Sequence, residues 1–209
     1  MKVYLRMALT VLALGLMVGF ARVNAQPEEN KEAEAPKKIA PEALEKSLKK
    51  VLPEFDNKVL ADVKYVDDKS LTDKCDYEAG KGCKVYTAKK KGAEVGFAIQ
   101  WTSQEGLKGP ITILLGVTPE GDITGLDILD QSETPNRGDK ITTPEFQGQF
   151  VKRNLTNTKW AIDKEKKDPG DIKAITGASF SSRAVTGAVK DVLEFFDKNK
   201  ATLVKAKGK

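Results

Sequence analysis

The hydrophobic and polar positions of the chain divide it into three stretches. An apolar run fills residues 7–20, broken only by one threonine and two glycines. Residues 26–38 are polar, rich in Glu, Lys and Ala, and contain no large apolar side chain. From residue 39 onward, apolar side chains recur at the spacings of helices and strands. This pattern predicts a leader, a linker and then a folded domain.

Three segments of that domain have helical spacing. The first begins at Pro41 and is stopped by Pro53, the second covers residues 143–155, and the third covers residues 181–197. The apolar positions expected to face the core are Leu44, Leu48 and Val51 in the first helix, Phe146, Phe150 and Val151 in the second, and Val185, Val189, Val192 and Phe196 in the third.

Four segments between the helices are predicted strands. Residues 84–87 and 95–101 flank a Lys-rich turn that ends in Gly92, and residues 111–117 and 123–129 flank the turn sequence TPEGD. Hairpins followed by helices predict an α+β fold, in which antiparallel strands pack with helices, and not a doubly wound parallel sheet.

The apolar run at the start of the chain is preceded by Lys2 and Arg6 and closed by Arg22. At about 14 residues it is shorter than the ~20 of a spanning helix, and residues 23–25 (VNA) are typical of a signal-peptidase site. Snorkelling of the flanking arginines would lengthen it into an anchor, so a cleaved signal and a membrane anchor both stay open. In either case the N-terminal positive charges predict that the rest of the chain is exported.

Composition restricts the chemistry of the chain. It contains no histidine and only two cysteines. A Ser-His-Asp site, a His-ligated zinc and a bis-His haem are therefore excluded, and two thiolates are too few for an ordinary iron–sulfur cluster. We expect no metal site, and any electron transfer requires an organic cofactor. The net charge of +5 comes with no nucleic-acid-binding motif, so we expect no nucleic acid partner.

The two cysteines, Cys75 and Cys83, enclose a turn-rich loop that contains Gly80 and Gly82. In an exported protein this spacing predicts a structural disulfide. A redox-active pair is the alternative, but the cysteines do not form a Cys-x-x-Cys motif at the start of a helix.

Residues 175–182 (ITGASFSS) run directly into the last predicted helix. The first turn of a helix offers free backbone N–H groups and the positive end of the helix dipole, which suit an anion such as phosphate. A hydroxyl in this position can donate a hydrogen bond, act as a nucleophile or carry a covalent phosphate. Serine and threonine are also common helix caps, and spacing alone favours that structural interpretation.

Residues 176–179 (TGAS) resemble the Ser/Thr-Gly-Ala-Thr signature of the covalent FMN-binding domain family. Residues 132–141 (SETPNRGDKI) resemble the Glu-Thr-Pro-Gly-Leu-Gly segment of that family, and residues 109–111 resemble the opening of its central strand pair. The matches span residues 84–197. Their order, together with one N-terminal apolar segment, is most similar to the G subunit of the Rnf ion-translocating electron-transport complex.

The resemblance implies an FMN cofactor joined by a phosphoester to the hydroxyl of Ser179. The other cofactor contacts that it implies are Thr176, Gly177, Ala178, Ser181, Ser182, Glu133 and Thr134. It also implies five segments: a signal or membrane-anchor segment at 1–25, a linker at 26–38, an N-terminal helix and cysteine loop at 39–83, the FMN-binding domain at 84–200 and a basic tail at 201–209.

The chain departs from the family pattern at several positions. Ser179 stands where threonine is usual. Lys173 stands where the recognition pattern of the flavin transferase usually has aspartate, and Asp171 lies two residues earlier. Asn136 and Arg137 replace a glycine and an apolar residue.

The resemblance implies an electron-transfer subunit of a membrane-bound ion-translocating oxidoreductase complex, not a stand-alone enzyme. Other membrane and iron–sulfur subunits would be its partners, and a flavin transferase would act during maturation. The apolar segment would be a single-pass anchor in the cytoplasmic membrane, with the folded domain on the periplasmic side.

Two alternatives stand beside this interpretation. The chain could be a component similar to the C subunit of a sodium-translocating NADH:quinone reductase, or a non-redox exported binding or scaffold domain. A serine hydrolase is excluded, because Ser181 replaces the second glycine of a nucleophile elbow and no histidine can act as base.

Overall fold

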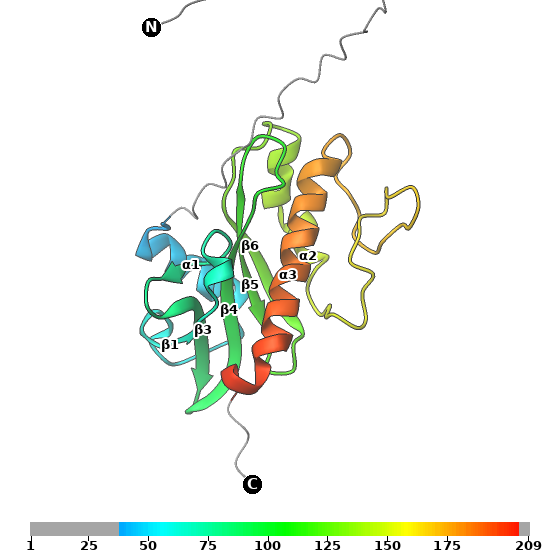
Figure 1. Cartoon of the computed structure of the whole chain (residues 1–209). Helices are drawn as coiled ribbons and strands as arrows, with labels where there is room; N and C mark the ends of the chain where they lie inside the picture. Colours follow the sequence, from blue (N-terminus) through cyan, green and yellow to red (C-terminus); the bar gives the residue numbers. More distant parts are fainter. Residues whose placement is uncertain (1–37, 205–209) are drawn as a thin grey trace, which may run out of the picture. The chain divides into compact units, whose positions relative to one another are not determined.

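The computed structural model describes residues 38–204, where one antiparallel sheet lies between helices (Figure 1). The strands are β1 (Val63–Val66), β2 (Tyr77–Glu78), β3 (Gly82–Lys90), β4 (Ala93–Ser103), β5 (Ile111–Val117) and β6 (Ile123–Asp130). The α-helices are α1 (Pro41–Val51), α2 (Pro144–Gly148) and α3 (Ser179–Leu203), and short 3-10 helices are η1 (Val59–Ala61), η2 (Lys69–Leu71) and η3 (Gly138–Thr142). The predicted α+β class is confirmed.

The strand order in the sheet is β1-β3-β4-β5-β6, with β2 paired to β3. Both predicted hairpins are present, and the first turns at Lys91 and Gly92, which have φ of 52° and 80°. β1 pairs antiparallel with β3, so residues 39–83 contribute to the same sheet as the rest of the domain. The predicted anchor, most of the linker and the end of the basic tail lie outside the described residues.

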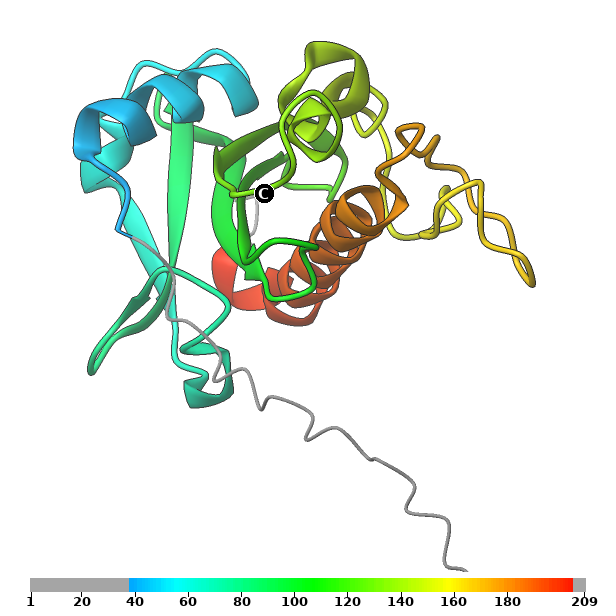
Figure 2. The same cartoon turned by 90° about the horizontal axis from the view of Figure 1, so that it is seen from above.

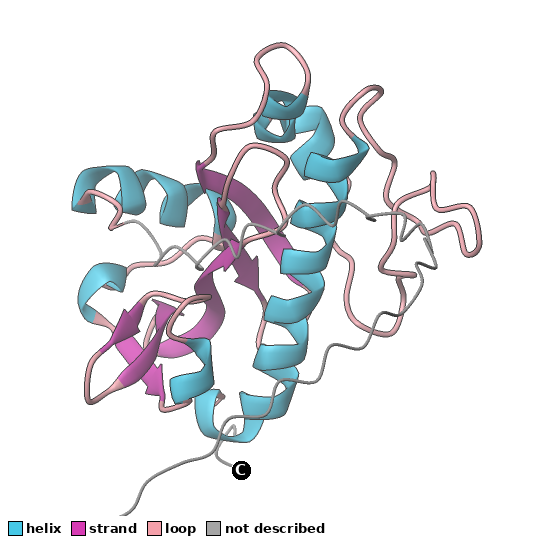
Figure 3. Cartoon of the chain, turned by 45° about the horizontal axis from the view of Figure 1, so that its top comes forward, coloured by secondary structure: helices cyan, strands magenta, loops and turns pink. Residues whose placement is uncertain are grey.

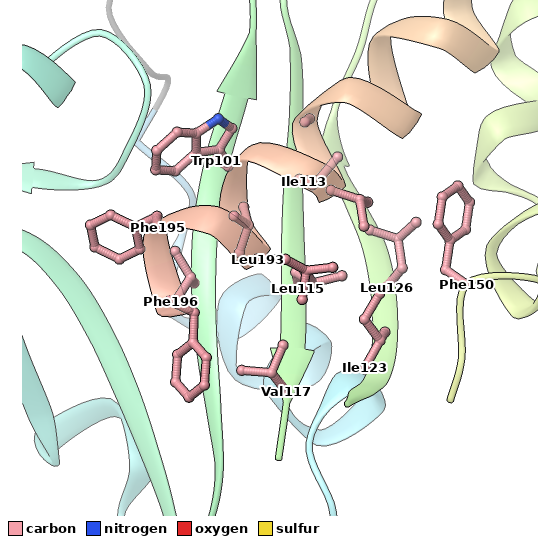
Figure 4. Packing of buried hydrophobic residues seen from close by; sticks show 14 of the residues in the cluster. Trp101, Ile113, Leu115, Val117, Ile123, Leu126, Phe150, Leu193, Phe195 and Phe196 are labelled. Carbon is pink, nitrogen blue, oxygen red and sulfur yellow. The ribbon is translucent and has the colours of Figure 1, made fainter. Parts of the chain in front are cut away.

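The two faces of the sheet carry separate cores, because successive side chains of a strand point to opposite sides. α1 and α3 cover these opposite faces (Figure 2). On the α3 face, Phe97 lies against Phe196 and Trp101 lies against Phe195, with ring centroids 5.5 and 5.6 Å apart. Figure 4 shows this packing between strands and α3. All seven positions of β5 are buried, since helices cover the sheet on both sides.

On the other face, the C-terminal end of α1 lies directly on the backbone of β5 and β6. A Cβ atom at Gly116 would lie 2.1 Å from the Val51 carbonyl oxygen, and one at Gly125 would lie 2.7 Å from Val51 Cα. The hydroxyl of Thr124 donates a 2.6 Å hydrogen bond to the same carbonyl. The two glycines therefore permit an approach that any side chain would block.

The helix predicted over residues 143–155 is wrong in length, because α2 ends at Gly148. Its start is normal, with the Thr143 hydroxyl accepting from the backbone N–H of Phe146. Beyond α2 the chain pairs with the start of β6, since Ile123 exchanges backbone hydrogen bonds with Lys152 and Arg153 at 2.8 Å each. A tertiary contact thus replaces the helix that the local spacing favours.

Phe146 and Phe150 of this segment are buried as predicted, whereas Val151 is 38% exposed and its predicted inward position is wrong. Between α2 and α3 the chain forms no further helix or strand (Figure 3). Among residues 38–204, no helix is both long and apolar enough to cross a membrane.

The last helix is longer than predicted at both ends, because α3 begins at Ser179 and continues to Leu203.

Cys75 and Cys83 are joined by a disulfide with a Cα–Cα distance of 5.7 Å, and both are fully buried. Cys75 also forms a β-bridge with Trp101, so the loop is attached to the middle of the sheet.

Candidate functional site

The signature residues 175–178 form a turn that leads directly into α3. The backbone N–H of Ala178 donates to the carbonyl of Ile175 at 3.0 Å, and Gly177 adopts a φ of +78°. This left-handed conformation favours glycine, and the space beside Gly177 is open. Ala178 is the N-cap residue and provides no side-chain cap. The N-terminus of α3 therefore has backbone N–H groups without a side-chain partner.

Ser179 lies in the first turn of α3, half-buried, while Thr176 and Gly177 are exposed. The hydroxyls of Ser179 and Thr176 form no hydrogen bond with any residue between 38 and 204. The structural interpretation of Ser179 as a helix cap is therefore not supported. Its hydroxyl is a free group at the positive end of a long helix.

Ser182 has a different role from that of Ser179. Its hydroxyl accepts from the backbone N–H of Ile175 at 3.0 Å and donates to the carbonyl of Ala178 at 2.9 Å. The side chain is fully buried. The two hydrogen bonds of the Ser182 hydroxyl thus fix the signature turn to the first turn of the helix.

Glu133 joins three segments that are far apart in the sequence. Its carboxylate accepts from the Ser181 hydroxyl at 2.5 Å and from the backbone N–H of Lys108 at 2.9 Å. Glu133 and Ser181 are only 4% and 1% exposed. The Gln131 side chain accepts from the backbone N–H of Glu133 at 2.6 Å. Hydrogen bonds to an ionised group are strong, so this contact holds the segments together.

Two glycines enclose the Glu133 carboxylate. A Cβ atom at Gly138 would lie 2.8 Å from the Ser181 hydroxyl, and one at Gly106 would lie 3.0 Å from Glu133 Oε1. Gly138 belongs to the segment 132–141 that resembles the family pattern, whereas Gly106 and the Lys108 N–H were not recognised in the sequence, because their importance depends on the fold alone. Thr134 is half-buried and its carbonyl accepts from two backbone N–H groups of the following turn.

The structure brings the predicted residues together around the start of α3. Ser181, Ser182 and Glu133 form the buried frame, and the signature turn with Thr176 and Ser179 lies at its surface. Lys173 is exposed and exchanges backbone hydrogen bonds with the Gln149 side chain.

The chemistry of these residues fits FMN, which combines a phosphate, a polyol chain and a flat ring. The uncapped first turn of α3 suits the phosphate. Asp139 Oδ1 is buried without a hydrogen-bond partner in the described part of the chain, so it is available as an acceptor. Two exposed apolar side chains flank the site in sequence, Leu107 at 51% and Phe180 at 60%, and they suit an aromatic ring.

Comparison with known proteins matches residues 106–194 to the model of the FMN-binding domain. A Cereibacter sphaeroides protein, named as the G subunit of an ion-translocating oxidoreductase complex, is 34% identical over 169 residues, which are 78% of this chain and 72% of the relative. The Shewanella loihica protein of the same name is 33% identical over 125 residues, so the match spans only 57% of that relative's length and 57% of this chain.

Among solved structures, the C subunit of the Na⁺-translocating NADH-quinone reductase from Parabacteroides distasonis is 21% identical, with a TM-score of 0.44 over 56% of this chain and 62% of that chain. The predicted resemblance is confirmed by the sequence relatives. Residues 106–194 match the FMN-binding domain model, and the chain belongs to the family of the G subunits of Rnf-type ion-translocating oxidoreductase complexes.

Proposed function

We propose that the chain is an electron-transfer subunit of an Rnf-type ion-translocating oxidoreductase complex, and that it carries FMN through a phosphoester on Ser179. One observation carries the proposal: the Ser179 hydroxyl is free at the uncapped start of α3, within the segment that matches the FMN-binding domain. The α3 dipole and its free N–H groups would stabilise the phosphate charge there.

The remaining site residues would hold and orient the cofactor. Thr176 offers a second free hydroxyl, and the open side of Gly177 lets a ligand approach the backbone closely. Asp139 supplies a buried acceptor, while Glu133 and Ser181 keep the surrounding loops in place. Bound FMN supplies the electron-transfer chemistry itself.

A covalent link suits the predicted export of the domain, because no pool of free FMN outside the cytoplasm would keep a weak site filled. A flavin transferase would attach the cofactor. Asp171 would then take the part of the aspartate that Lys173 replaces, although its carboxylate accepts from the backbone N–H of Lys159 at 2.7 Å. Other members of the complex would exchange electrons with the chain at the outer face of the cytoplasmic membrane, where residues 7–20 would anchor it.

The test is the mass of the full chain produced together with a flavin transferase. We expect a gain of one FMN less one water, because the phosphoester replaces the hydroxyl proton of serine and one phosphate hydroxyl. The adduct should survive denaturation and disappear in Ser179→Ala. Thr176→Ala is the matched control, since it removes the neighbouring free hydroxyl and should keep the adduct.

Ser179→Thr should also keep the adduct, because it restores the residue usual in the family. An unmodified wild-type chain would contradict the proposal, and so would an adduct that persists in Ser179→Ala. If the adduct is lost in Thr176→Ala but kept in Ser179→Ala, the flavin is attached to Thr176 and not to Ser179.

A further inference from the structure

A cavity of about 870 Å³ lies beside the N-terminal end of α1, away from the FMN-binding site. None of its lining residues belongs to the segments around Glu133 and Ser179. α1 packs against β5, β6 and η1, and β1, β3 and β4 form the floor of the cavity on the same face of the sheet. Cavities of this size are typical of small-molecule sites.

The lining of the cavity combines apolar and polar side chains. The apolar lining includes Ile39 just before α1, Leu44 of α1 and Val63 of β1. The polar lining includes Gln100 of β4 and Tyr86 of β3. A site built in this way suits an amphipathic ligand.

Gln100 is a buried polar residue of this cavity whose side chain lacks a partner among the described residues. Its side chain is only 3% exposed, and it forms no hydrogen bond with any residue between 38 and 204. The next polar side chain on the same face of β4, Thr102, is paired with Thr112 through their hydroxyls at 3.0 Å. The Gln100 amide lines the wall of the cavity, so both its carbonyl oxygen and its NH₂ group are open to a ligand group.

The other polar groups of the cavity are rich in hydrogen-bond acceptors. The Tyr65 hydroxyl donates to Glu78 at 2.9 Å, and the Tyr86 hydroxyl donates to Asp76 at 3.0 Å. Burial and the neighbouring Asp76 raise the pKa of Tyr86, so its hydroxyl stays protonated. With these protons already donated, the tyrosine and carboxylate oxygens remain as acceptors for the N–H groups of a ligand. Two cations, Lys38 and Lys84, also line the cavity, and Lys84 is paired with Asp76 and Glu78.

We propose that this cavity is a second ligand site, which binds a neutral amphipathic small molecule through a primary or secondary amide paired with the Gln100 side chain. The amide of the ligand would donate to the Gln100 carbonyl and accept from its NH₂ group. Its apolar body would lie against Ile39, Leu44 and Val63. The site is independent of the proposed flavin attachment.

Benzamide and benzoate are suitable probes, because they share a ring and a shape while only benzamide offers N–H donors without a charge. Titration of the full chain with millimolar benzamide should shift the NMR signals of the Gln100 side-chain amide and of Leu44 and Tyr86. Benzoate should bind at least about tenfold more weakly.

Gln100→Leu should weaken benzamide binding by at least about tenfold, because it removes the amide that would pair with the ligand. Gln147→Leu is the matched control. Gln147 is 4% exposed and also has an unpartnered amide nitrogen, but it lies outside the cavity, so benzamide binding should be unchanged.

Three results would overturn the proposal. They are the absence of any shift with benzamide, equal binding of benzamide and benzoate, and a Gln100→Leu protein that binds as well as the wild type.

Discussion

At the scale of single residues, Glu133 organises a site whose parts are far apart in the sequence. Forty-eight positions separate it from Ser181, yet their side chains form a 2.5 Å hydrogen bond. The same carboxylate accepts a hydrogen bond from the backbone N–H of Lys108. One buried charge therefore connects the loop before β5, the loop after β6 and the first turn of α3.

Replacing Glu133 by glutamine is expected to lower the free energy of unfolding by about 1.5–3 kcal/mol, because a hydrogen bond to a charged group contributes that much. Urea unfolding near neutral pH measures the loss. Ser181→Ala removes the same hydrogen bond from the other side, so the double variant should cost less than the sum of the single variants, by at least about 0.5 kcal/mol. Strictly additive losses would show that the two side chains do not cooperate.

At the scale of elements, the position of α1 depends on the glycines beneath it. Val51 lies so close to β5 and β6 that its carbonyl accepts a hydrogen bond from Thr124 of β6. No part of the helical pattern of α1 signals this contact. The spacing of Leu44, Leu48 and Val51 predicts the helix and its buried face, and the glycines determine how closely that face approaches the sheet.

Gly116→Ala is expected to destabilise the domain by about 1–3 kcal/mol, since the added methyl group would overlap the backbone of Val51 and force α1 away. Thermal unfolding followed by circular dichroism measures the effect. Gly148→Ala in α2 is the matched control, because a Cβ atom there meets nothing within 4 Å. That variant should be as stable as the wild type or slightly more stable. Equal effects of the two changes would refute the close-approach argument.

At the scale of the whole molecule, the disulfide between Cys75 and Cys83 reduces the conformational entropy of the unfolded chain. The bond closes a loop whose ends are eight positions apart. In the chain-entropy account a loop of this length stabilises the native state by about 2–3 kcal/mol. Reduction should lower the free energy of unfolding by that amount, measured by urea unfolding with and without dithiothreitol.

The matched control for this measurement is the double variant Cys75→Ala and Cys83→Ala, whose stability should not change with the reductant. If the reductant leaves the wild type unchanged as well, the two cysteines contribute no cross-link.

The elements of the fold were predictable where local pattern and turn chemistry act together. α1 has the predicted bounds because Pro41 and Pro53 frame its apolar stripe. β5 has its predicted bounds because continuous apolar residues precede a strong turn. The short strands β1 and β2 had no such signal, and they exist because β3 offers them hydrogen-bond partners. The helix over residues 143–155 failed for the related reason that β6 pairs with part of it.

Local patterns along the chain sufficed for the α+β class, the main hairpins, the start of the site and the resemblance to an FMN-binding domain, since these depend on residues a few positions apart. Only the tertiary structure decided that the Ser182 hydroxyl is hydrogen-bonded to the signature turn while the Ser179 hydroxyl is free. It also decided that Glu133 accepts from Ser181 and that Gln100 lines a cavity. Each of these depends on which distant segments meet, and packing sets that arrangement rather than spacing in the sequence.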